Sequence, residues 1–414
     1  MRDENTKAKD ASRICWHELE LWLRGQLQGL VQGLLEEEVT ELIGRCRHER
    51  RNGIDENPAY RNGHGKPRHL TLSSGTITVR RPRVRNMEER FESRILPLFV
   101  RRTSQVADLL PELYLHGLSL GDFDLALRGL LGEKAPLSAS TVARLKEKWQ
   151  AEHAEWSRRS LQGLEVAYLW VDGVYLKAGL EKQKAALLVA VAGLADGRKV
   201  LVALEAGHRE SEECWSALLR DLRERGMSMP RLVLGDGHLG IWAGLRNVFP
   251  ESEEQRCWNH RIVNILAKVP KRSQAQARMM LRVIPYAETV EEAVRLKGVF
   301  QKWCRERGLH AAAELIDHDW DRMVTFYRFP KDHWRHLRTS NAIESPFAAL
   351  RLRTDAAKRF KKVENATAVV FKMLLVAEKR FRKLNAPELL KEVFLGVTFH
   401  NGVPVKRQHT EAAA

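Results

Sequence analysis

The sequence is poor in features that define several common classes of protein. It has 5 cysteines among 414 residues, widely spaced and without a Cys-x-x-Cys pair. This argues against a disulfide-stabilised secreted domain and favours a reducing compartment. The longest apolar run, 185–195, is far shorter than the roughly 18–20 residues of a transmembrane helix. The polar start MRDENTKAKD does not resemble a signal peptide, and no internal repeat is present. We therefore expect a soluble, cytoplasmic protein.

Acidic residues are also scarce relative to basic ones. The chain has 53 Asp and Glu against 69 Lys and Arg, a formal net charge of +16. Such an excess favours polyanionic partners. It is concentrated in segment 328–383, which holds 15 basic and 5 acidic residues. A segment of this density suits contact with a phosphate backbone, although a solvated helical face has a similar composition. The length predicts two to three domains.

The first hundred residues show two patterns. In region 1–59, apolar residues three and four positions apart predict one long or two shorter helices between 12 and 47. A loop is expected over 53–65. Segment 60–102 then contains an alternating pattern around the turn Ser73-Ser74-Gly75, which predicts a β-hairpin. The trailing strand carries Arg80, Arg81, Arg83 and Arg85. These are candidate DNA contacts, or charges that protect a strand edge from pairing.

Segment 103–160 predicts three helices. The first covers about 104–116, the second begins at Ser119 or Asp122, and the third opens at 138–141. A short helix, a short turn and a basic third helix favour a helix-turn-helix module that binds DNA. Arg144 and Lys146 on the third helix are its candidate DNA contacts. A three-helix bundle without DNA has the same pattern.

Segment 161–269 changes to strands. Apolar runs at 166–172, 184–195 and 199–205 predict a three-stranded antiparallel meander. A helix over 211–226, a strand at 232–234, a helix over 239–248 and a short strand at about 256–258 follow. This order is that of an α/β ribonuclease H-like domain, in which helices flank a mixed sheet.

Two acids lie at strand ends in this segment. Asp172 and Asp236 each follow an apolar run and each precede a glycine. Alone, either one is also typical of a simple turn. In a ribonuclease H-like order, however, the first and fourth strands are neighbours, so the two carboxylates would meet. Adjacent carboxylates repel unless they share a proton or a cation. Oxygen ligands suit Mg²⁺ or Mn²⁺, and two such ions catalyse phosphodiester chemistry.

The best candidate for a third metal-binding acid is Glu344, in TSNAIESPFAALRLRT. Ser340 or Asn341 is a suitable helix cap, which places Glu344 in the first turns. Asp355 and Glu364 are alternatives within the basic stretch. Positions 236 and 344 are 108 residues apart, so we expect a helical insertion over 270–335 and the last part of the core over 336–390. The tail, 391–414, is weakly patterned.

Further basic residues near these acids are candidate DNA contacts. Arg351 and Arg353 follow Glu344 by about two helical turns, a spacing suited to the same phosphate backbone. The others, from the end of the first strand to the basic helix, are Lys177, Arg338, Lys358, Arg359, Lys361 and Lys362.

Together these motifs resemble the bacterial Mutator-type transposases, insertion-sequence enzymes with an Asp-Asp-Glu active site. The resemblance covers about residues 60–390. It is carried, in this order, by YRNG, a Ser-x-Ser-Thr helix start, VDGVYLK, GDGHLG, CWNH and NAIESPFAALRLRT. It implies a ribonuclease H-like fold with a helical insertion before the Glu, and places the family's acids on Asp172, Asp236 and Glu344. It also implies metal-dependent cleavage at element ends and transfer of the 3′-hydroxyl. A homodimer is expected because two ends of double-stranded DNA must be brought together.

Cys257 and His260 in CWNH are candidate metal ligands. A zinc site would require two more ligands at a suitable spacing, and none is recognisable in the sequence. The resemblance implies a structural role near the active site instead. Two other functions remain open: a ribonuclease H-like nuclease without strand transfer, and a domesticated, non-catalytic DNA-binding protein. Terminal inverted repeats around the coding region would argue against the last.

Overall fold

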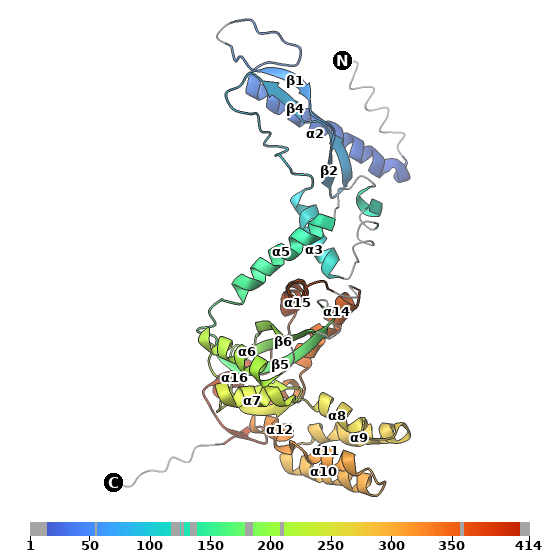
Figure 1. The fold of residues 1–414 in the computed structure, drawn as a ribbon, viewed down its shortest axis with the longest axis vertical. Helices are drawn as coiled ribbons and strands as arrows, with labels where there is room; N and C mark the ends of the chain where they lie inside the picture. The colour runs from blue at the N-terminus through green and yellow to red at the C-terminus, as the bar shows by residue number, and fades with distance from the viewer. Residues whose placement is uncertain are drawn as a thin grey trace, which may run out of the picture. The chain divides into compact units, whose positions relative to one another are not determined.

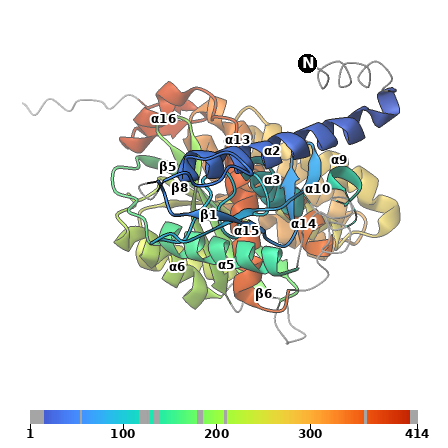
Figure 2. The ribbon, with the colours of Figure 1, turned by 90° about the horizontal axis from the view of Figure 1, so that it is seen from above.

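A computed structural model describes residues 15–53, 56–116, 125, 128–132, 139–178, 185–207, 211–356 and 360–405. The chain divides into two compact units, 1–145 and 146–414, and Figures 1 and 2 show the ribbon of both. Helix α5, Ala139–Trp156, contains the boundary between them. None of the helices in the described part of the chain is both long enough and apolar enough to cross a membrane.

The N-terminal unit is organised around helix α2, Leu19–Ile43, which follows a short 3-10 helix, Trp16–Glu18. Its buried residues Leu35 and Val39 belong to two small apolar clusters, which also contain residues of the strands between 60 and 85. Figures 1 and 2 show α2 lying along these strands. The predicted hairpin is confirmed as β2, Arg68–Leu72, and β3, Gly75–Val79, paired antiparallel.

Two details of this unit differ from the sequence prediction. Tyr60–His64, expected in a loop, forms strand β1. Pro82–Arg85, expected on the trailing strand of the hairpin, forms a separate strand, β4, which pairs with β1. Strand β1 consists mostly of polar residues, so no apolar pattern indicates it in the sequence. It is a strand because its backbone pairs with β4, which is distant in sequence. Of the predicted helices, α3, Ser104–Leu115, and α5 are confirmed. The second lies outside the described residues except for positions 125 and 128–132.

The C-terminal unit is built on a five-stranded sheet in the order β7-β6-β5-β8-β9. The strands are β5, Val166–Leu176; β6, Ala185–Leu194; β7, Lys199–Gly207; β8, Leu232–Gly235; and β9, Glu253–Arg256. The first three form the predicted antiparallel meander, and β8 lies parallel to β5. The short last strand ends at Arg256, slightly earlier than predicted.

Helices cover both faces of this sheet. Helices α6, Glu212–Glu224, and α7, Leu239–Val248, cover one face. There Trp215 and Trp242 pack with Leu169 and Val171 of β5 in the main core, and Figure 1 shows both helices beside the sheet. Side chains alternate along a strand, so Tyr168 and Trp170 point to the other face. That face contacts α14, Asn341–Ala356, α15, Val363–Glu378, and α16, Pro387–Phe394.

The segment between β9 and α14 is helical, and it includes the insertion predicted over 270–335. It contains α8, Trp258–Leu266; α9, Gln274–Val283; α10, Val290–Arg305; α11, His310–Asp317; α12, Trp320–Val324; and α13, Trp334–Leu337. Short 3-10 helices join them at Lys271–Ser273, Ile284–Tyr286, Thr325–Arg328 and Lys331–His333. Helices α9 to α11 form a group apart from the sheet in Figure 1. Beyond α16, β10, Phe399–His400, and β11, Val403–Pro404, form a small hairpin.

Candidate active site

Asp172 and Asp236 come from neighbouring parallel strands. Trp170 of β5 is opposite Leu234 of β8, and each acid follows by two residues. Asp172 is buried, 7% exposed, and its Oδ1 accepts a hydrogen bond of 2.8 Å from the Gly173 amide. The strand was predicted to end at this acid, but β5 continues to Leu176 because β6 pairs with it along this stretch. Asp172 therefore lies inside a strand, on the face that α14 covers.

Asp236 opens the loop between β8 and α7. Its Oδ1 accepts a hydrogen bond of 2.9 Å from the His238 amide, and the carboxyl group is half-buried. Gly237 has a φ of +96°, and a Cβ there would lie 2.1 Å from Nε of Arg256. Arg256 in turn forms an ion pair of 2.7 Å with Asp319, which Arg261 and Arg322 also contact. The glycine thus gives the guanidinium room to connect the Asp236 loop to the insertion.

Glu344 reaches the same region from the first turn of α14. Its amide donates to the Ser340 carbonyl at 2.9 Å, and the Ser340 hydroxyl contacts its Oε1. The Cys257 thiol lies 3.7 Å from the same oxygen, and Nδ1 of His260 lies 3.6 Å from it. Cys257 is itself held by a hydrogen bond of 2.8 Å from its amide to the Gly235 carbonyl. The structure therefore places the Cys-x-x-His pair directly against the third predicted acid.

The charges of these groups influence one another. Burial first, and then the carboxylates of Asp236 and Glu344, raise the pKa of Asp172 to about 7, against the opposing effects of His260 and the Gly173 amide. The pKa of His260 is raised to about 9 by the Cys257 side chain first and by Glu344 and Asp172 as well, against the effect of burial. Three carboxylates and a histidine therefore form one electrostatic cluster, with Asp172 on β5, Asp236 in the loop after β8 and Glu344 on α14.

A divalent cation fits this donor set. The acids supply only oxygen atoms, which suits Mg²⁺ or Mn²⁺. Burial, and after it the neighbouring carboxylates, disfavour the charged form of Asp172, and a bound cation would offset both effects. Ser340 was predicted as a candidate helix cap, and Cys257 and His260 as a structural pair near the active site. The direct contacts of these side chains with the Glu344 carboxylate were not predicted. A polar residue at the expected helix cap was the only sequence signal for the contact of Ser340. The contacts of Cys257 and His260 required the fold.

The predicted basic residues of this unit lie in different surroundings. Lys177 is exposed at the end of β5, where its carbonyl accepts a hydrogen bond of 2.9 Å from the Phe360 amide. This bond brings exposed Lys361 and Lys362 beside the same strand end. Arg351 is also exposed. Lys358 and Arg359 lie outside the described residues.

Two predicted DNA contacts point elsewhere. Arg353 is buried, 2% exposed, so its guanidinium does not face solvent as a phosphate contact requires. Arg338 lies 4.5 Å from the Tyr286 ring centroid and also contacts Phe326 and Trp334. Burial lowers the pKa of Arg338. Both arginines follow apolar neighbours in sequence, and the pattern alone did not separate them from exposed ones.

The predicted basic residues before the core are mostly exposed. Arg80 and Arg81 lie between β3 and β4, not on a trailing hairpin strand, and Gln32 of α2 bonds both backbone groups of Arg80 at 2.9 Å. Arg81 donates to the Phe91 carbonyl at 2.9 Å. Arg83 and Arg144 are exposed, and Lys146 is half-buried. These placements leave Arg80, Arg83 and Arg144 accessible to a polyanion.

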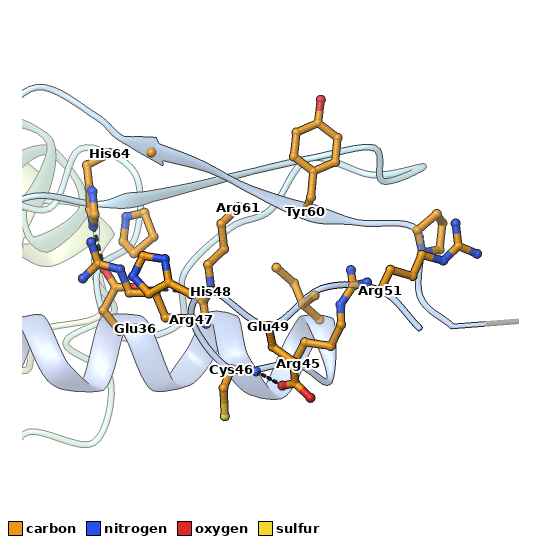
Figure 3. A pocket seen from close by; sticks show the side chains of 14 residues that line it. Glu36, Arg45, Cys46, Arg47, His48, Glu49, Arg51, Tyr60, Arg61 and His64 are labelled. Carbon is orange, nitrogen blue, oxygen red and sulfur yellow. Dashed lines mark hydrogen bonds and ion pairs between the residues drawn. The ribbon is translucent and has the colours of Figure 1, made fainter. Parts of the chain in front are cut away.

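A basic pocket of about 580 Å³ lies between the end of α2 and strand β1. Figure 3 shows Arg45, Arg47 and Arg51 following the helix, with Tyr60 and Arg61 on the strand. Arg61 and His64 both contact Glu36, at 3.3 and 2.6 Å. Arg47 and His48 are exposed. Tyr60, Arg61 and Gly63 of the YRNG motif therefore line a basic pocket, which was not predicted.

Comparison with known proteins identifies the family of the chain. The family model described as "Transposase, Mutator family" matches residues 3–383, nearly the whole chain. The protein belongs to the Mutator family of transposases.

The curated relatives are insertion-sequence transposases. The chain is 43% identical over 302 residues to the transposase for insertion sequence element IS6120 of Mycolicibacterium smegmatis, covering 73% of this chain and 93% of the relative. It is 39% identical over 281 residues to that of element IST2 of Acidithiobacillus ferrooxidans, covering 67% and 95%. The match to the ISRM5 transposase of Rhizobium meliloti (strain 1021) is 27% identical over 368 residues, covering 88% and 89%. The predicted family is thus confirmed.

Proposed function

We propose that this transposase cleaves double-stranded DNA at the ends of an insertion sequence and transfers the 3′-hydroxyl to a target, using Asp172, Asp236 and Glu344. The observation that carries the proposal is their convergence from three separate segments. Asp172 and Asp236 leave adjacent parallel strands, and Glu344 acts on the pKa of Asp172 from α14. The sheet order β7-β6-β5-β8-β9 with helices on both faces supports a ribonuclease H-like fold.

In this proposal the three acids would hold Mg²⁺ or Mn²⁺, as a pair of ions. When bound, the ions would activate a water or a 3′-hydroxyl and stabilise the leaving oxygen of the phosphodiester. Asp172 must be ionised to act as a ligand, so its proton is released before or during metal binding. Ser340 contacts one oxygen of Glu344 and restricts the orientation of that carboxylate.

The basic surface supplies the DNA contacts in this proposal. Lys177 lies just after the end of β5, five residues beyond Asp172, and the hydrogen bond from the Phe360 amide to its carbonyl brings Lys361 and Lys362 near this strand end. Exposed cations there would hold the phosphate backbone beside the acids. Arg83, Arg144 and the pocket of Figure 3 would contact DNA in the N-terminal unit. A homodimer would bring two ends together. Sedimentation of the DNA complex tests this, and one chain per pair of ends would contradict it.

The proposal is tested in cells that carry the element with its own ends. We would compare wild-type protein with Glu344→Gln, which keeps the shape of the side chain but removes its charge. Glu364→Gln is the matched control, because Glu364 is an exposed acid in the first turn of the neighbouring helix α15. PCR across excised or circular junctions reports cleavage, and sequencing of new insertions reports strand transfer. Both products are expected with wild type and the control, and neither with Glu344→Gln.

The other outcomes discriminate among functions. Products with Glu344→Gln would remove Glu344 from the site; the third acid would then be Glu364 if Glu364→Gln gives no products, and Asp355 if it gives them. Cleavage without new insertions from wild type would favour a nuclease that lacks strand transfer. No products from wild type in a competent host with intact ends would favour a non-catalytic DNA-binding protein.

A further inference from the structure

Cys257, His260 and Glu344 form a cluster with three different ligand types. One potential ligand atom from each lies within 4.8 Å of the other two. Cys257 caps helix α8 and His260 lies three residues later, so one helical turn presents both side chains to α14. The sequence showed only the first two of these residues as a pair. The fold supplies a third ligand from 84 positions beyond His260.

The distances in the cluster match the edges of a zinc tetrahedron. Zinc binds sulfur at about 2.3 Å and nitrogen or oxygen at about 2.0–2.2 Å, so its ligand atoms lie roughly 3.3–3.8 Å apart. The Cys257 sulfur is 3.7 Å from Oε1 of Glu344, and Nδ1 of His260 is 3.6 Å from the same oxygen. Both distances fall within that range without any movement of the chain.

Burial and access also suit a metal ion. Cys257 is buried, while the side chains of His260 and Glu344 are 38% and 26% exposed. An ion therefore has a route from solvent, with a water completing the fourth position. Nδ1 of His260 is buried and, within the described part of the chain, has no hydrogen-bond partner. Its lone pair is thus available once the ring is neutral.

We propose that Cys257, His260 and Glu344 bind Zn²⁺, and that this ion inhibits the protein by occupying the acid required for Mg²⁺. On binding, the thiol loses its proton to solvent and sulfur becomes a thiolate ligand. Thiolate and imidazole favour zinc over magnesium, so Mg²⁺ does not compete well for this position. The inhibitory part rests on the proposed function, whereas zinc binding does not.

The binding test uses Co²⁺ as a spectroscopic substitute for zinc on the full-length chain without DNA. Wild-type protein should show a thiolate-to-cobalt charge-transfer band, which one equivalent of Zn²⁺ per chain removes. Cys257→Ser should lose the band. Cys46→Ser is the matched control, because Cys46 also lies near a histidine and a glutamate, His48 and Glu49, in the basic pocket. Its band should remain.

Circular dichroism shows whether Cys257→Ser folds. If it does not fold, a second pair of variants tests zinc binding. His260→Asn retains the thiol and should weaken Co²⁺ binding by at least about tenfold, since loss of an outer-shell partner alone weakens metal binding by ~10–100-fold. Asp236→Asn should keep the band, because Asp236 belongs only to the proposed magnesium site. No band in wild type, a band that survives in Cys257→Ser, or unchanged affinity in His260→Asn would overturn zinc binding.

Inhibition is measured separately as DNA cleavage by wild type in Mg²⁺ with increasing Zn²⁺. A decrease in cleavage that follows zinc occupancy of the cobalt-defined site is expected. Full activity at saturating occupancy would overturn the inhibitory role and leave the binding site in place. Absence of cleavage in Mg²⁺ alone would contradict the proposed function and not the zinc site.

Discussion

The Tyr168 hydroxyl lies 2.7 Å from Nδ1 of His333, although the residues are 165 positions apart. Both side chains are fully buried. His333 also places Nε2 at 3.1 Å from the Ala386 carbonyl, so the neutral ring donates there and accepts from tyrosine. Burial lowers the pKa of His333, which is consistent with a neutral ring. This pair connects the central strand β5 to the segment before α13 and to the start of α16.

Replacing Tyr168 with Phe should destabilise the C-terminal unit. The change leaves Nδ1 of His333 without its donor, and an unsatisfied buried group costs about 1–3 kcal/mol. Tyr175→Phe, on the same strand but 48% exposed, is the control and should cost less. Urea unfolding followed by circular dichroism measures both. Equal losses for the two variants would show that the buried pair contributes nothing specific.

Asp172→Asn should stabilise the metal-free protein at pH 8 while abolishing DNA cleavage. The pKa of Asp172 is raised from 3.8 to about 7 in the folded chain, so the folded state binds this proton more tightly than the unfolded state. The stability contributed by this group therefore falls as pH rises from about 4 to 7 and is lowest above 7. The amide removes that cost, a gain of about 1–3 kcal/mol. Thermal unfolding at pH 5 and 8 should show the gain mainly at pH 8.

Magnesium binding should weaken below neutral pH. Below about pH 7 the metal must displace the proton of Asp172, so affinity should fall by up to roughly tenfold per pH unit. Calorimetric titration of the DNA-free protein with Mg²⁺ between pH 5.5 and 8.5 measures this. Asp172→Asn provides the comparison, since it has no proton to release. An affinity for wild type that stays constant from pH 8 to 5.5 would show that Asp172 is not a ligand.

DNA binding should weaken with salt, and Lys361 and Lys362 should contribute to the slope. Replacing both with Ala removes two phosphate contacts, which should reduce the slope of log K against log salt by about 2. The control is the double change Lys302→Ala and Arg305→Ala, which removes the same charge from exposed positions on α10. Fluorescence anisotropy at several salt concentrations gives the slopes. An identical slope for both doubles would place the DNA elsewhere on the protein.

The sequence predicted the C-terminal core well because its strands are buried on both faces. Such strands are continuous apolar runs, as in β6. Asp172 interrupts the run in β5 and is therefore easily recognised in the sequence. The helices of the insertion were equally visible from their apolar spacing. The order of elements also predicted that β5 and β8 are neighbours, and the two strands pair in parallel.

Other features were not accessible from local pattern. Strand β1 is polar, and only its pairing with β4 reveals it. Asp319 has a φ of +60° and contacts Arg256, Arg261 and Arg322, yet in sequence it is an ordinary acid between helices. Similarly, Arg351 and Arg353 differ only by position on one helix, and the fold exposes one and buries the other. Such assignments depend on which segments meet in space.

The separation of 108 positions between Asp236 and Glu344 has a consequence for chain synthesis. When the ribosome has completed β5 and β8, the first two acids exist, but the third carboxylate is not yet made. Any product that ends in the insertion would keep the entire N-terminal unit and lack Glu344. A premature stop there would therefore separate the parts proposed to contact DNA from the part proposed to cut it.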